Sequence, residues 1–486
     1  MIKIIFINSP VFNFLGGSHS ETTPLGLMYL AAVLERAGFV AKVIDAEALQ
    51  LSWEDLGKKI VTEQPDLIGV SSFTLGLPAL FKTVAIAKQL RPQAKIIVGG
   101  PGPTYEPERV LTEGKEIDLV VRGEAENTIL DIMEWFQGKK SEEEIRGITF
   151  RKNDQIINNQ AQVYVDDLDS LPLPAYHLLE PSFSGYSGIH RGGYYDLVMP
   201  NAVIMASRGC PHRCIFCSNK SVKMRRRKPV KIVDEIELCL KVGAKSIQFY
   251  DDEFIGSSPD QNQWIEDICD EIIKRGLTGV GYIVQGRCSR WIKLETLIKM
   301  KQAGFKWIWW GVESGSQRVL DAIRKDTKIE EIKESFSLAR QAGLKSLMFL
   351  MVGLPGEKEE DAILTGRLVE EIKPDLVRFH ITTPFPGSEL WEMLKSKNQI
   401  EDYNLLHYNT RYTAVHHTDE LSAKKIEEIY QMLVFRYESN KKNLLVVLLK
   451  SFLSVREFKK LPQRLKKIFI FVPSWIKIKI SKFISR

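Results

Sequence analysis

Three cysteines, Cys210, Cys214 and Cys217, lie on one short stretch of the chain, Ser-Arg-Gly-Cys-Pro-His-Arg-Cys-Ile-Phe-Cys. Three thiolates on one loop can bind three irons of a [4Fe–4S] cluster, which normally takes four cysteines, and leave the fourth iron open to a substrate. With six cysteines in 486 residues, this spacing is expected by chance in about one such chain in a thousand. The alternative is a zinc site, but zinc ribbons usually supply a second Cys-x2-Cys pair and this chain has none. The loop therefore predicts an iron–sulfur cluster with one open coordination position.

The other cysteines, Cys239, Cys269 and Cys288, share no ligand spacing. Cys239 and Cys269 fall in helix-like, partly apolar segments, and we interpret them as small core residues. Cys288 follows the end of an expected strand, so its role stays open. No disulfide framework is indicated, and a low-potential cluster needs a reducing compartment.

The cysteine loop resembles that of the radical S-adenosylmethionine (SAM) superfamily. The resemblance implies that the amino and carboxylate groups of SAM chelate the open iron. It also implies that an electron from the cluster cleaves SAM to a 5′-deoxyadenosyl radical, and that a protein such as flavodoxin or ferredoxin donates this electron. Within the loop it implies Phe216 as a SAM contact. It nominates no catalytic residue beyond the cofactor ligands, because this chemistry needs no general base.

The N-terminal third alternates short apolar strands with amphipathic helices. We expect strands at 3–8, 41–45, 67–71, 95–98 and 117–121, and helices at 25–37, 80–90 and 127–136. Apolar strands separated by helices indicate a parallel, doubly wound sheet, in which ligands bind beyond the carboxyl ends of the strands.

The loops of this first sheet carry its expected binding residues. Pro24-Leu25-Gly26, Gly99-Gly100-Pro101 and Arg122-Gly123-Glu124-Ala125-Glu126 together resemble the cobalamin-binding domain that precedes the radical module in one radical SAM subfamily. The resemblance implies a cobalamin site made by Pro24, Leu25, Gly26, Ser71, Ser72, Phe73, Gly99, Gly100, Pro101, Arg122, Gly123 and Glu124. A glycine pair allows a bulky ligand close to the backbone, although a merely tight turn explains it equally well. No Gly-x-Gly-x-x-Gly fingerprint opens the first helix, which argues against a dinucleotide.

Two features depart from many cobalamin domains. None of the eight histidines lies in the Asp-x-His-x-x-Gly pattern whose His binds cobalt from below, and Gly102 stands where a His often follows Gly-Gly-Pro. Cobalamin binding without a protein His ligand is common in the radical subfamily. We therefore expect bound cobalamin with no histidine of the protein on cobalt.

A second alternation of strands and helices follows a stretch at 139–198, interpreted as a linker because of its charged run, its strand pair around 147–158 and its Pro-, Gly- and Tyr-rich end. Strands are expected at 202–206, 246–250, 279–284, 307–311, 346–352 and 376–381, with helices at 229–242, 260–274, 294–303, 316–323, 329–342 and 359–372. Six such repeats predict an open, partial (β/α)6 barrel with its site at the strand carboxyl ends. We expect an α/β protein with a Rossmann-like cobalamin-binding domain at 1–138, the linker, a radical SAM domain at 199–400 and a helical, basic C-terminal extension at 401–486.

Every expected barrel strand ends in a polar or glycine-rich motif. The resemblance implies that the acidic segment holds the ammonium group of SAM, that the Glu-Ser pair binds the ribose hydroxyls and that the 351–357 loop contacts the adenine. The implied SAM contacts are Asp251, Asp252, Glu253, Gln285, Arg287, Glu313, Ser314, Gly353 and Pro355. Helix capping by the aspartates and a plain helix start at Ser-Gly-Ser stay open as alternatives. The rigid prolines at 382–388 suit a wall of the substrate cavity.

Two further runs have structural interpretations. The run 307–310, Trp-Ile-Trp-Trp, is expected in the core, since a strand covered on both faces is apolar throughout. The basic run 225–228 is interpreted as a solvated entry to a helix, and the alternative is attraction of an anionic substrate or an electron donor.

The net charge of +6 is unevenly distributed, because residues 441–486 hold 13 Lys or Arg and one acid. Apolar stretches at 443–455 and 468–484 lie among these charges. The segment is either a helical cap that neutralises the acidic body or an anchor on an anionic membrane surface. No signal peptide and no apolar run of ~18 residues is found, so we expect a cytoplasmic protein with, at most, peripheral membrane contact.

The sequence thus predicts a cobalamin-dependent radical SAM enzyme that methylates an unactivated carbon of a small-molecule or lipid-like substrate, with no nucleic-acid partner. A second hypothesis keeps the cofactors but ends in oxidative cyclisation or ring contraction. A methylthiotransferase is disfavoured, because such enzymes carry a second cysteine cluster near the N-terminus and no Cys precedes Cys210. The intact cysteine loop argues against a non-enzymatic cobalamin sensor.

Overall fold

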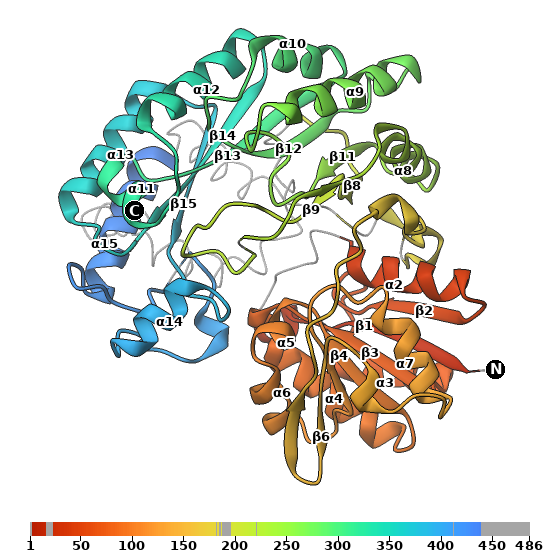
Figure 1. Ribbon diagram of the computed structural model, residues 1–486. Coiled ribbons are helices and arrows are strands. Elements are labelled where there is room, and N and C mark those ends of the chain that lie inside the picture. Colours follow the sequence, from red (N-terminus) through yellow and green to blue (C-terminus); the bar gives the residue numbers. More distant parts are fainter. Residues whose placement is uncertain are drawn as a thin grey trace, which may run out of the picture.

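The computed structural model describes residues 2–15, 23–180, 182–183, 186, 196–219, 221–411 and 413–438. The basic segment 441–486, with its expected cap or anchor, lies outside the described residues. Two α/β lobes, each built on its own sheet, lie side by side (Figure 1). Among the described helices, none has the length and apolar character needed to cross a membrane.

The first lobe is built on a seven-stranded sheet in the order β2-β1-β3-β4-β5-β6-β7. Its elements are β1 (Lys3–Asn8), α1 (Phe12–Leu15), α2 (Leu25–Arg36), β2 (Val40–Asp45), α3 (Trp53–Glu63), β3 (Leu67–Ser71), α4 (Leu77–Leu90), β4 (Lys95–Gly99), α5 (Pro101–Tyr105), α6 (Pro107–Glu113), β5 (Leu119–Val121), α7 (Thr128–Phe136), β6 (Ile148–Lys152) and β7 (Gln155–Asn158). The first five strands run parallel, as predicted; β6 pairs antiparallel with β5, and β7 pairs antiparallel with β6. The expected strand pair of the linker therefore extends this sheet, which continues past residue 138.

Alternate residues of the first sheet face opposite helix layers. Ile4 and Phe6 of β1 pack in one core with α2 and α7, whereas Ile5 and Ile7 pack in another with α3 and α4. Both sets are buried because parallel strands covered on both faces have no solvent side. The carboxyl ends of the strands are the edge that stays open to a ligand.

The second lobe holds a six-stranded parallel sheet in the order β15-β14-β13-β12-β11-β8, with its helices on the outer face (Figure 1). Its elements are β8 (Asn201–Ile204), β9 (Ser207–Arg208), β10 (Arg225–Arg226), α8 (Pro229–Lys241), β11 (Ser246–Phe249), α9 (Asp260–Lys274), β12 (Tyr282–Arg287), α10 (Leu294–Gln302), β13 (Phe305–Glu313), α11 (Gln317–Ala322), α12 (Ile329–Gln341), β14 (Lys345–Val352), α13 (Glu359–Ile372) and β15 (Leu376–Ile381). The predicted open barrel is confirmed.

The aromatic run on β13 lies in the core, as predicted. Trp310 packs against Phe336 of α12 with ring centroids 6.0 Å apart, whereas Trp307 and Trp309 join Leu347 in a small cluster on the other face of the sheet. Side chains on both faces of this strand are therefore buried, and on the second face Trp309 also borders the cavity between the two lobes. Cys239, Cys269 and Cys288 are fully buried as well, which confirms the core assignment of the first two.

The chain after β15 contacts both lobes. Helix α14 (Glu389–Ser396) packs Leu390 and Trp391 into the hydrophobic cluster of the first lobe. Helix α15 (Ala423–Leu433), whose Ser422 side chain accepts the capping bond, packs against β15 and α13. In the predicted C-terminal extension at 401–486, Leu405, Tyr408 and Val415 join the same cluster of the first lobe, and α15 packs against the second sheet, so the described part of the extension contacts both sheets.

Candidate active site

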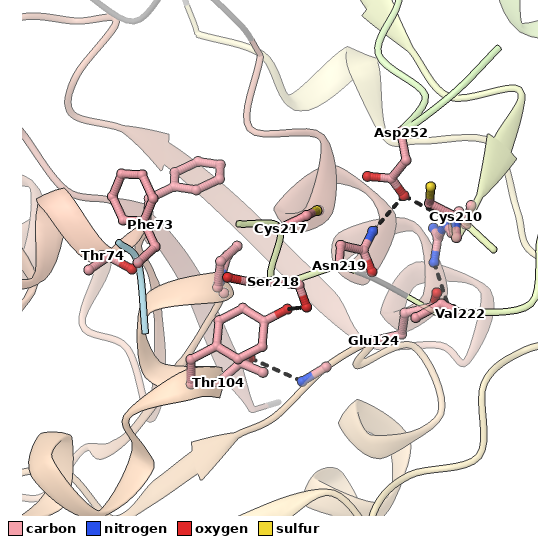
Figure 2. A pocket seen from close by; sticks show the side chains of 18 of the residues that line it. Phe73, Thr74, Thr104, Glu124, Cys210, Cys217, Ser218, Asn219, Val222 and Asp252 are labelled. Carbon is pink, nitrogen blue, oxygen red and sulfur yellow. Dashed lines mark hydrogen bonds and ion pairs between the residues drawn. The ribbon is translucent and has the colours of Figure 1, made fainter. Parts of the chain in front are cut away.

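A cavity of about 1390 Å³ lies between the two lobes and is lined by both of them. Phe73, Thr74 and Thr104 of the first lobe contribute to its wall, and Cys217 and Ser218 of the second lobe line the same space (Figure 2). In both types of sheet, ligands bind at the carboxyl ends of the strands. The cavity joins these two edges and is therefore the candidate active site.

The cysteine loop connects β9 with β10, and Cys210, Cys214 and Cys217 all line the cavity. Gly209, directly before the first cysteine, has φ +91°, and a Cβ atom there would lie 2.5 Å from the carbonyl oxygen of Lys223. Only glycine fits this position, because a side chain would be strained and would collide with backbone. The local sequence therefore fixes where the loop leaves the strand.

The donor set of the loop fits a cluster with three protein ligands. In the part of the chain that the structure describes, no three His, Cys, Asp or Glu side chains converge to hold a single metal ion. A cluster makes a different demand, since each thiolate binds a separate iron. Burial raises the pKa of the Cys210 thiol to about 12 and also raises that of Cys217. The bound iron itself therefore has to stabilise the thiolates.

The three acidic residues after β11, Asp251, Asp252 and Glu253, have different positions relative to the cavity. Contrary to the prediction, the Asp251 side chain does not face the cavity: it is 1 % exposed and accepts hydrogen bonds from the backbone N–H groups of Ala206 (3.2 Å) and Ser207 (2.5 Å). Burial raises its pKa to about 7. Asp251 thus fixes the turn that leads into the cysteine loop.

Its two neighbours do line the cavity. Asp252 accepts hydrogen bonds from the N–H of Gly209 (3.2 Å) and from the side-chain amide of Asn219 (2.5 Å), which points at it beside Cys210 (Figure 2). Burial raises the pKa of Asp252. The carboxylate of Glu253 lies 2.9 Å from Nε2 of His212. Both carboxylates adjoin the cysteine loop, where a ligand with an amino group can pair with them.

Two buried cations lie next to the cysteines. Nη1 of Arg287 is 3.9 Å from Sγ of Cys214, and Nη2 is buried with no hydrogen-bond partner among the described residues. Nζ of Lys325 lies 2.8 Å from Oε1 of Glu313, and both side chains are at most 10 % exposed. Burial lowers the pKa of Lys325, but the Glu313 carboxylate and the Cys214 thiol outweigh it, so the pKa is raised. A buried guanidinium nitrogen without a partner fits the carboxylate of SAM, because buried charged groups need one.

Sequence reasoning missed Lys325. It lies beyond the short helix α11, and Arg324 and Asp326 on either side of it have positive φ angles. This tight turn brings the chain back to the cavity, where Lys325 lies within hydrogen-bond distance of Glu313. No pattern in the sequence shows such a turn, although a lysine between two expected helices was the available signal.

The remaining predicted SAM residues separate into two groups. Phe216, Gln285 and Glu313 line the cavity, whereas Ser314, Gly353 and Pro355 do not. The Ser314 hydroxyl is buried and accepts a hydrogen bond from the N–H of Ser316 (3.2 Å), which is the helix-start alternative.

The Gly353 loop is held from behind. Glu357 accepts hydrogen bonds from the N–H groups of Gly353 (2.6 Å) and Leu354 (3.1 Å), and Nε2 of His416 lies 2.9 Å from the Gly353 carbonyl oxygen. The C-terminal part of the chain therefore fixes a loop that the sequence assigned to the SAM site.

Most of the predicted cobalamin residues share the cavity wall. Those that line it are Leu25, Gly26, Ser71, Phe73, Gly99, Gly100, Pro101, Gly123 and Glu124. Pro24, Ser72 and Arg122 do not. The Arg122 guanidinium donates to the carbonyl oxygen of Ile148 (3.0 Å) and is directed at β6, so its predicted contact is not found.

The wall of the first lobe fits a large, flat ligand. Phe73 is 70 % exposed although it lines the cavity, so its ring is available for a bound apolar ligand to cover. Gly100 has φ +92°, and a Cβ atom there would lie 2.7 Å from the carbonyl oxygen of Ser72. The two loops thus approach each other as closely as backbones can. The described histidines that line the cavity, His212 and His380, both belong to the second lobe.

Ion pairs connect the lobes at the edge of the cavity. Glu124 accepts hydrogen bonds from Arg225 (3.0 Å), and Glu126 pairs with Arg208 (2.7 Å). Arg225 and Arg227 are each 5 % exposed. The interpretation of residues 225–228 as a solvated helix entry is therefore wrong for these two arginines, because carboxylates compensate their burial.

Comparison with known proteins agrees with this arrangement. The B12 binding domain family matches residues 14–133, and the Radical SAM superfamily matches residues 204–369. An uncharacterized methyltransferase of Pyrococcus horikoshii is 28% identical over 438 residues, which cover 88% of this chain and 92% of that protein. The anaerobic magnesium-protoporphyrin IX monomethyl ester cyclase of Rubrivivax gelatinosus is 30% identical over 422 residues, covering 84% of this chain and 73% of the cyclase.

A solved structure shows the same fold. The cobalamin-dependent SAM radical enzyme OxsB, with aqua-cobalamin and SAM bound, superimposes with a TM-score of 0.74 at 18% identity, over 89% of this chain and 66% of the OxsB chain. Both domain matches fall on the two lobes that form the cavity, and the cysteine loop lies within the second match. The chain therefore belongs to the radical SAM superfamily, in the branch with an N-terminal B12-binding domain, and is a radical SAM enzyme whose cofactors are a [4Fe–4S] cluster, SAM and cobalamin.

Proposed function

We propose that this enzyme transfers a methyl group to an unactivated carbon of a small-molecule or lipid-like substrate. When bound, the cluster and SAM supply a 5′-deoxyadenosyl radical that removes a substrate hydrogen atom, and cobalamin supplies the methyl group. The observation that carries the proposal is the cavity shared by the cysteine loop and the loops that follow β3 and β4. One substrate in that space is in reach of both cofactor sites, which is what a reaction between two bound groups requires. The name of the Pyrococcus relative supports methyl transfer.

The residues of this chain hold the two sites at a fixed separation. The Tyr105 hydroxyl on α5 donates to the carbonyl oxygen of Ser218 (3.0 Å), and the Ser218 hydroxyl donates to that of Pro386 (3.1 Å). The ring of Tyr105 also lies against Gly387, where a Cβ atom would be 2.2 Å from the ring. One tyrosine of the first lobe thus contacts both the cysteine loop and the loop after β15, which positions the two lobes relative to each other.

The reductant and the location of the enzyme are part of the proposal. Radical SAM chemistry needs an electron from outside the enzyme, and we propose a flavodoxin or ferredoxin as its donor. A reducing cytoplasm suits a protein whose six cysteines form no disulfide bond.

The test begins with the cluster. Anaerobically reconstituted protein should hold one [4Fe–4S] cluster, bind hydroxocobalamin and form 5′-deoxyadenosine from SAM with a reductant. Cys210→Ala, Cys214→Ala and Cys217→Ala should each abolish 5′-deoxyadenosine, whereas Cys239→Ala, which removes a buried thiol outside the cavity, should retain it. Zinc in place of iron, or one dispensable cysteine among the three, would refute the proposal.

Oxidative cyclisation is the second candidate, because the Rubrivivax relative is named a cyclase. SAM with a deuterated methyl group separates the two reactions. Methyl transfer gives a product in which a CD3 group replaces one hydrogen atom, and it consumes a second SAM to remethylate cobalamin. Cyclisation gives a product without the label.

A further inference from the structure

The part of the cavity formed by β13, β14, β15 and the loop after β15 is largely apolar, although Glu313 of β13 and Thr383 also line it. Trp309, Phe349, Met351, Ile381 and Phe385 contribute to it. Met351 and His380 are directly paired across β14 and β15, so one polar ring is set among these side chains. These strands lie towards the edge of the sheet opposite β8, which delivers the cysteine loop. The wall is therefore a surface for a substrate and not a cluster ligand set.

The cations in the described wall are neutralised. Arg208 pairs with Glu126 at 2.7 Å, Arg225 with Glu124 and Lys325 with Glu313 at 2.8 Å. Among the described cations that line the cavity, Arg287 alone has no carboxylate partner, and its Nη1 lies at the cysteine loop, 3.9 Å from Sγ of Cys214. An anionic substrate away from that loop would meet no unpaired Lys or Arg among the described residues that line the cavity, since Arg411 and Arg378, whose charges act on His380, do not line it. Burying an uncompensated anion is costly.

His380 lies among the apolar side chains of this wall, beside Thr410, which also lines the cavity. Its Nδ1 lies 3.2 Å from the Thr410 hydroxyl, and its ring centroid is 5.7 Å from that of Phe349. Burial and the nearby charges of Arg411 and Arg378 lower its pKa to about 4. The carboxylate of Glu438, the acid on the neighbouring segment, accepts from the Phe379 N–H and from Arg378 and not from the imidazole. At neutral pH the ring is therefore uncharged, with one nitrogen on Thr410 and the other able to bond a ligand.

From these contacts we propose that the wall of β13–β15 binds a neutral, largely apolar substrate and hydrogen-bonds its polar group, such as a hydroxyl, to His380. This inference rests on the proposed function and specifies its substrate class. The hydrogen bond fixes the polar end of the substrate, so the carbon that reacts is set by its distance from that end.

The test compares three probes with the same alkyl chain: 1-decanol, decanoate and decyl phosphate. Titration calorimetry uses the full chain, loaded with hydroxocobalamin and reconstituted with its cluster. We expect 1-decanol to bind at least about tenfold more tightly than either anion, because the described wall offers no free cation. His380→Phe should weaken 1-decanol binding roughly fivefold, and His380→Gln, which keeps a neutral hydrogen-bonding group, should restore it. His380→Arg should reverse the order of 1-decanol and decyl phosphate.

The control variant is His177→Gln, an exposed histidine paired with Glu35 outside the cavity, which should bind all probes as the unmodified protein does. Each variant is compared only if its cobalamin absorbance and iron content match those of the unmodified protein. Preference for an anionic probe, no binding of 1-decanol, or unchanged 1-decanol affinity in His380→Phe would overturn the substrate class. In that case cobalamin binding and 5′-deoxyadenosine formation would still stand, whereas loss of those two signals would overturn the proposed function instead.

Discussion

At the scale of single residues, two buried carboxyl groups support the loops of the site without facing the cavity. Asp251 supports the turn before the cysteine loop, and Glu357 supports the Gly353 loop, and burial raises the pKa of each to about 7. A carboxyl group whose pKa is raised in the folded protein favours folding in its protonated form. These side chains therefore couple loop geometry to pH.

The Glu357 carboxyl predicts the direction in which stability changes with pH. Its folded pKa of about 7 lies above its ordinary value of 4.5, so its contribution to stability is complete below pH 4.5 and is lost as the pH rises through 7. The loss amounts to about 3 kcal/mol at most. Glu357→Gln should therefore show a smaller fall in thermal midpoint between pH 5.5 and pH 8 than the unmodified protein. Glu359→Gln, an exposed acid two residues on, is the control, and an equal pH dependence in both variants would refute the role of Glu357.

At the scale of elements, the close approach of the β3 and β4 loops depends on Gly100. Gly100→Ala should lower the thermal midpoint and weaken hydroxocobalamin binding, because the new Cβ atom would overlap the Ser72 backbone and the positive φ would be strained. Gly38→Ala is the matched control: it has φ +85° and nothing within 4 Å, so it should cost about 1 kcal/mol and leave cobalamin affinity unchanged. Equal cobalamin affinities in the two variants, measured by absorbance titration, would contradict this role.

The elements also show what a sequence can and cannot predict. Strands such as β1 and β14 were predictable, because their apolar runs are short and are bounded by glycine or polar residues. The cysteine loop was predictable because its spacing is local. Lys325 was not, since its place depends on a turn after α11 that brings it to Glu313. The direction of Asp251 and Arg122 was not predictable either, because a strand-end position does not reveal whether a side chain meets a cavity or a neighbouring backbone.

At the scale of the whole molecule, Arg225 of the second lobe binds Glu124 and so positions the Arg122–Glu126 loop of the first lobe. Arg225→Met should weaken hydroxocobalamin binding about tenfold, equivalent to about 1.4 kcal/mol, although Arg225 belongs to the other lobe. The reason is that Glu124 would keep only its longer contact to Arg208 (3.4 Å). Arg226→Met is the adjacent control, because Arg226 pairs with Asp260 within the barrel. Equal cobalamin affinity in the two variants would show that the ion pair does not position the loop.

The last prediction at this scale is that the basic segment 441–486 binds an anionic membrane surface. Its 13 Lys and Arg residues lie among apolar stretches, and each basic residue near an anionic bilayer contributes about 1 kcal/mol. We expect the full chain to sediment with phosphatidylglycerol vesicles at low salt, to be released at high salt, and to ignore phosphatidylcholine vesicles. Truncation after Asn440 should abolish sedimentation but keep the cluster, whose ligands lie upstream. If the full chain ignores both vesicles and the truncated chain is insoluble, the segment is a structural cap. An apolar substrate would then have to reach His380 from solution and not from a bilayer.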